Sequence, residues 1–113
     1  MSIQQWSDHI WIIKLRDEPQ FSDTMNSLRD RLEDTSETPD IAADLASVTH
    51  VTSSNISQLL RTRQSLVRAE HRLRLCGIQD AVWTTLLTTG LDKVFEYSSD
   101  VAGALATLQL NRR

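Results

Sequence analysis

Glycine is scarce in this chain of 113 residues, which contains only Gly77, Gly90 and Gly103. None of them belongs to a glycine-rich turn after a strand, the arrangement that holds a nucleotide phosphate in Rossmann and P-loop proteins. Nucleotide chemistry of these types is therefore not expected.

Cysteine and long apolar runs are lacking too. Cys76 is the single cysteine, so an internal disulfide is impossible and we expect a cytoplasmic protein. No apolar run reaches the roughly 18 residues of a membrane span, and the first residues lack the pattern of a signal peptide. The length fits one domain, expected over residues 1–113.

Clustered metal ligands are also lacking, because the three histidines are scattered and zinc sites need grouped Cys and His. Cys76 falls within an expected strand, where a free cysteine usually acts as a small buried hydrophobe. We therefore predict no catalytic residue, no metal and no cofactor. We keep as one hypothesis a small α/β enzyme that uses Cys76 or a histidine.

Charge is unevenly distributed, although the net charge is only −3 and no nucleic-acid partner is expected. Residues 17–44 carry nine carboxylates and two arginines, whereas residues 61–74 carry five arginines and one glutamate. These clusters are either helix faces that pair within one molecule or complementary patches that attract a partner or a second copy.

The hydropathy pattern alternates between strands and helices. Strands are expected over residues 2–6, 9–15, 41–48, 71–78 and 93–97, and helices over 20–34, 54–70, 81–89 and 101–110. The turn residues Ser7 and Asp8 predict an initial hairpin. The order ββαβαβαβα predicts an α/β domain with a mixed, mostly parallel sheet of about five strands and four amphipathic helices.

The expected helices each carry an apolar stripe that should face the sheet. In the first helix the stripe is Phe21, Met25, Leu28 and Leu32. In the second it is Ile56, Leu59, Leu60, Leu66 and Val67, and in the third Val82, Trp83, Leu86 and Leu87.

A hydroxyl-rich turn, Thr52-Ser53-Ser54-Asn55, follows the central expected strand. Its side-chain oxygens can accept the free N–H groups of a first helical turn. The same helix start carries partial positive charge and therefore suits a phosphate. The turn is thus either a simple helix cap or the site of a phosphorylatable serine.

Residues 44–108 resemble the STAS domain, the fold of anti-sigma factor antagonists. The resemblance rests on the strand before Thr52, the Thr-Ser-Ser-Asn turn, the leucine-rich helix after it, and the segment Gly90-Leu91 followed by Val94-Phe95, Ala102 and Ala104-Leu105. The family turn reads Asp-Ser-Ser-Gly, so Thr52 stands in place of the Asp and Asn55 in place of the Gly. The initial hairpin and first helix also fit the family layout.

The resemblance implies a bacterial regulatory protein that binds an anti-sigma factor or serine kinase-like partner, with Ser53 at the phosphorylated position and Ser54 next to it. The alternative is a non-phosphorylated STAS scaffold that self-associates in a signalling assembly. The expected contact surface consists of Thr52, Ser53, Ser54, Asn55, Ser57 and Arg61.

Overall fold

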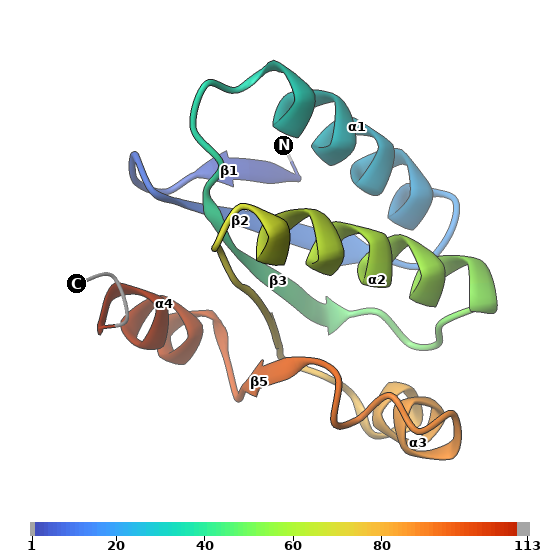
Figure 1. Ribbon diagram of the computed structural model, residues 1–113. Helices are drawn as coiled ribbons and strands as arrows, with labels where there is room; N and C mark the ends of the chain where they lie inside the picture. The colour runs from blue at the N-terminus through green and yellow to red at the C-terminus, as the bar shows by residue number, and fades with distance from the viewer. Residues whose placement is uncertain (1, 111–113) are drawn as a thin grey trace.

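A five-stranded sheet forms the centre of the protein in a computed structural model that describes residues 2–110 (Figure 1). The elements are β1 (Ile3–Gln5), β2 (Ile10–Arg16), α1 (Gln20–Asp34), β3 (Asp40–Ser47), α2 (Ser53–Arg68), β4 (Leu73–Cys76), α3 (Asp80–Thr88), β5 (Glu96–Ser98) and α4 (Val101–Leu110). The strand order is β1-β2-β3-β4-β5; β1 is antiparallel to β2, and the other neighbours are parallel.

The two faces of the sheet have different cores, because successive residues of a strand point to opposite sides. Odd-numbered residues of the central strands, such as Ile13, Ile41 and Leu75, join the larger core with residues of α1, α2 and α3. Even-numbered residues, such as Ile10 and Ala42, join the smaller core under α4. Figure 1 shows α4 apart from the layer formed by α1 and α2.

The predicted fold class is confirmed, including the hairpin at residues 7–8 and the order of all nine elements. The Ser7 hydroxyl accepts hydrogen bonds from the backbone N–H groups of His9 and Ile10, which closes the hairpin turn. The bounds predicted for the first and last helices agree with the structure. None of the helices within residues 2–110 is long and apolar enough to cross a membrane.

The strand predicted over residues 71–78 is shorter in the structure, because a residue with positive φ follows it and another precedes it. Glu70 has a φ of +64° and Gly77 a φ of +69°. A Cβ atom at Gly77 would lie 3.2 Å from the Ala46 Cβ, so the chain also passes close to β3 there. The last strand begins at Glu96, later than predicted, because residues 91–94 form a turn closed by a hydrogen bond from the Val94 N–H to the Leu91 carbonyl.

Three apolar side chains predicted to face inward are largely exposed. Trp83 and Leu87 are 36% and 49% exposed, because the nine-residue helix α3 buries only the stripe of Val82 and Leu86. Trp83 instead packs edge-on against Tyr97, with ring centroids 5.0 Å apart. Val67, at 51% exposure, lies in the last turn of α2 beside the buried stripe, which ends at Leu66.

Candidate functional site

The candidate site is the rim of the sheet where α1 and α2 begin. Both helices follow parallel strands, β2 and β3, so both start at the carboxyl edge of the sheet. The chain between β2 and α1 is joined to the loop after β3, since the Asp17 carboxylate accepts hydrogen bonds from the Thr49 N–H (2.9 Å) and hydroxyl (2.6 Å). These bonds fix the position from which α2 starts.

Thr52 caps the first turn of α2. Its hydroxyl oxygen accepts the backbone N–H of Asn55 at 3.1 Å, and the Asn55 side-chain oxygen accepts the backbone N–H of Thr52 at 3.1 Å. This is a capping box in which an asparagine takes the place of the usual Glu or Gln. The two residues that differ from the family turn therefore form one reciprocal cap.

Glu18 connects the starts of the two helices. Its carboxylate accepts hydrogen bonds from the Ser22 N–H (2.7 Å), the Ser22 hydroxyl (2.6 Å) and the Asn55 amide (3.2 Å). Gln58 closes the network: its amide donates to Ser22 at 3.1 Å and its oxygen accepts from Asn55. Pro19, at the cap position of α1, offers no side-chain acceptor, so Glu18 serves that helix as well.

The hydrogen bonds from Ser22, first its hydroxyl and then its N–H, lower the pKa of Glu18, and the Asn55 amide adds to the effect. In the same way, the Thr49 hydroxyl and N–H lower the pKa of Asp17. Both carboxylates are therefore held in the charged form by donors at the rim.

The rim exposes most of the side chains predicted to contact a partner. Thr52, Ser53 and Ser54 are exposed at the start of α2, which has no acidic residue in its first turn. Ser57 and Arg61 are exposed further along the helix, on the stripe that Ser54 begins. Asn55 differs from this expectation: it is 2% exposed, so it shapes the rim from inside and presents no surface to a partner.

The other candidate residues do not come together. The Cys76 thiol is buried and donates to the Ala43 carbonyl, and burial raises its pKa to about 12, which leaves little thiolate at neutral pH. His71 contacts the Asp40 carboxylate at 3.1 Å and lines a pocket with the exposed His9, whereas His50 is exposed in the loop after β3. Within residues 2–110, no three His, Cys, Asp or Glu side chains are grouped to hold a metal ion.

The acidic and basic clusters do not pair helix with helix. The ion pairs join His71 to Asp40, and both Arg72 and Arg74 to Glu96, all between or beside strands. No ion pair links α1 to α2 in the described part of the chain, so the charged faces of these two helices are solvated and not paired with each other. Their charges remain available at the surface.

We predict that Asn55→Ala lowers the free energy of unfolding by about 1–3 kcal/mol, because it removes the Asn55 side-chain oxygen that accepts the Thr52 N–H and a buried partner of Glu18. Urea denaturation followed by circular dichroism measures the change. Ser54→Ala, at the exposed neighbouring position, should change the stability by less than about 0.5 kcal/mol. Equal effects of the two substitutions would contradict the buried cap.

Glu18→Gln should lower stability at neutral pH by about 0.5–1 kcal/mol, the size of an exposed charge interaction. Since the folded pKa lies below the ordinary value of 4.5, the contribution of Glu18 is fully present above pH 4.5 and is lost as the pH falls through the folded pKa. The difference in stability between wild type and Glu18→Gln should therefore be larger at pH 7 than at pH 3. Glu37→Gln, which removes the same charge from an exposed loop, is the control. A stability difference between wild type and Glu18→Gln that does not change with pH would contradict the role of the charged carboxylate.

The family model of the STAS domain matches residues 5–104. A search of curated protein sequences finds no match. The solved structure of an RsbS variant from Moorella thermoacetica has a TM-score of 0.78 and 19% sequence identity, and the match covers 95% of this chain and 94% of that one.

Two further structures share the fold. A chain of the stressosome, described as a signal integration and transduction hub, has a TM-score of 0.76 at 19% identity, over 98% of this chain and 99% of that one. An anti-sigma-factor antagonist (STAS) domain protein from Planctomyces limnophilus has a TM-score of 0.75 at 19% identity, over 88% and 91%. The family match covers most of the described residues and agrees with the observed order of strands and helices: this chain belongs to the STAS domain family.

Proposed function

We propose that the protein is an anti-sigma factor antagonist-like regulator that binds an anti-sigma factor or serine kinase-like partner through the rim at the start of α2. It acts by binding, with no catalysis of its own, as a single domain in the bacterial cytoplasm, where a free thiol such as Cys76 stays reduced. Ser53 is the proposed phosphorylation site. The observation that carries the proposal is the exposure of Ser53 at a helix start without acidic neighbours in its first turn.

A phosphate at Ser53 would lie between two influences, the positive end of the α2 dipole and the charged Glu18 carboxylate that accepts from Asn55. It would add roughly −1.5 to −2 charges at neutral pH, and the partial positive charge of the helix start would stabilise them. The cap itself uses Thr52 and Asn55, so modification of Ser53 would leave those hydrogen bonds in place. A change of about 1.4 kcal/mol in a contact alters partner affinity tenfold, so the modification would switch partners without refolding the domain.

The test incubates the protein with ATP and the kinase encoded by a neighbouring gene, and measures the mass of the intact protein. We expect the wild type and Ser54→Ala to gain one phosphate group, because Ser53 is the proposed acceptor, and Ser53→Ala to gain none. A gain that depends on Ser54 would move the site by one residue. An unmodified wild type would remove the switch and leave a binding module.

A second candidate is a scaffold that self-associates in a signalling assembly. It is favoured by the exposed carboxylates of α1 and the exposed arginines of α2, which form no ion pair with each other within residues 2–110. Complementary patches of this kind attract a second copy, and salt screens them. Light scattering at low salt should then show an oligomer that dissociates at high salt. A monomer at both salt concentrations would rule against this candidate.

A further inference from the structure

A groove of about 470 Å³ lies between α1 and α2, on the flank next to the rim. Its α1 wall extends from Met25 to Glu33 and its α2 wall from Gln58 to Ser65. Each wall is therefore about 10 Å long or slightly more, at 1.5 Å per residue. Because the groove follows two helical turns on both sides, its shape suits an extended or helical segment better than a compact small molecule.

The register of the two walls follows from a hydrogen bond at the rim. The Gln58 amide donates to the Ser22 hydroxyl, 36 residues earlier in the chain. The two helices start at the same sheet edge, contact each other and run side by side in the same direction (Figure 1). When the same offset of 36 residues is continued along both helices, Arg61 of α2 lies at the level of Met25 of α1.

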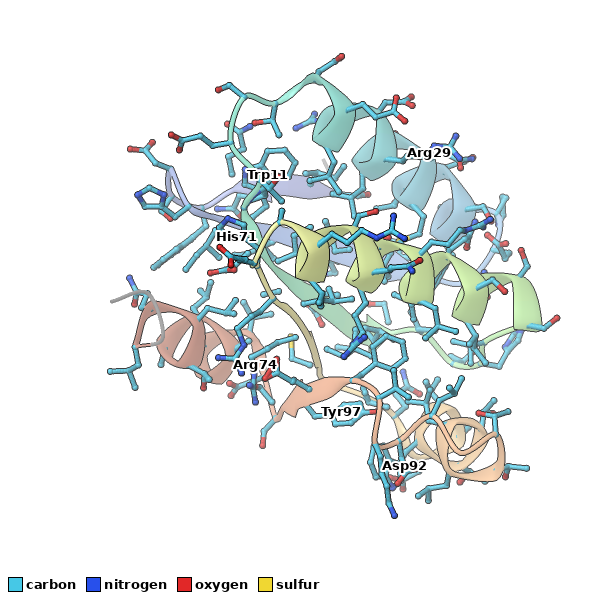
Figure 2. The ribbon with its side chains drawn as sticks, viewed as in Figure 1. Trp11, Arg29, His71, Arg74, Asp92 and Tyr97 are labelled. Carbon is cyan, nitrogen blue, oxygen red and sulfur yellow. The ribbon has the colours of Figure 1, made fainter. Side chains whose placement is uncertain are left out.

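The charged groups of the groove then follow a simple order. Arg61 comes first, at the level of Met25, Arg29 follows four residues later on α1, and Glu33 four residues after that. Each step is about one helical turn, or roughly 6 Å. Arg29 projects from α1 in Figure 2. No carboxylate within residues 2–110 forms an ion pair with Arg29 or Arg61.

The groove also offers apolar surface between these charges. Leu32 of α1 lines it and is only partly buried by the core, whereas Met25, which also lines it, is 4% exposed. Arginine guanidinium groups recognise carboxylates through paired hydrogen bonds, so an acidic ligand is favoured at the two arginines and a basic group near Glu33. An apolar side chain of the same ligand would cover Leu32.

We propose that the α1–α2 groove docks a helical segment of a partner protein, with two carboxylates one turn apart facing Arg61 and Arg29 and a basic residue one turn further facing Glu33. The inference rests on the proposed function, since Arg61 belongs to both surfaces, and it names the chemistry of the partner. Arg29 belongs to the groove and not to the rim, so a substitution at Arg29 tests the groove without changing the rim.

The probe is a fluorescent helical peptide that carries Glu, Glu and Lys at successive one-turn intervals, with leucines beside them, and its binding is measured by fluorescence anisotropy. We expect Arg29→Glu to weaken binding at least tenfold, and Arg29→Glu with Arg61→Glu to abolish it. Arg68→Glu, an exposed arginine of α2 outside the groove, is the matched control and should change binding less than twofold. A peptide with Lys at all three positions should bind the double variant, because Glu33 is unchanged in it.

Several results would overturn the inference. These are no binding to the wild type, an equal loss with Arg68→Glu, or displacement of the peptide by inorganic phosphate, which would indicate a small-anion site. Self-association that Arg29→Glu abolishes would assign the groove to a second copy. Ser53→Asp should leave peptide binding intact, so a negative kinase test with intact peptide binding would refute only the proposed switch.

Discussion

The hydrogen bonds around Glu18 are the constraint on which the functional side of the molecule depends. One carboxylate caps α1 through Ser22 and holds the buried amide of Asn55, which in turn caps α2 with Thr52. The two helix starts are thereby fixed relative to each other. Both the exposed serines and the groove between the helices take their geometry from this network.

The same network explains how the chain departs from the family turn and keeps the family fold. Asparagine at position 55 is accommodated because its side chain turns inward and finds acceptors on Glu18 and Gln58. Thr52 supplies the cap oxygen that an aspartate would supply. The rim therefore keeps an exposed serine pair while its hydrogen bonds are satisfied within the domain.

Local pattern was enough to predict the element order and the bounds of α1, because the stripe from Phe21 to Leu32 has a clear helical period. It also located the turn that opens α2. It did not reveal that Asn55 is buried, since its partner Glu18 is 37 residues away in the chain. The exposure of Trp83 was missed for a related reason. The periodicity of α3 shows which residues share a face, but only its packing in the fold decides how many of them are buried.

Gly77 carries a consequence for how this sequence can vary over time. The bend after β4 passes within van der Waals contact of Ala46, so any side chain at position 77 competes for the space that the alanine methyl occupies. A smaller residue at position 46 would not lift this restriction, because the positive φ of Gly77 disfavours any other residue and the Ala46 backbone lies nearly as close. Position 77 is therefore held to glycine by the backbone, and position 46 is held to a small side chain by the bend beside it.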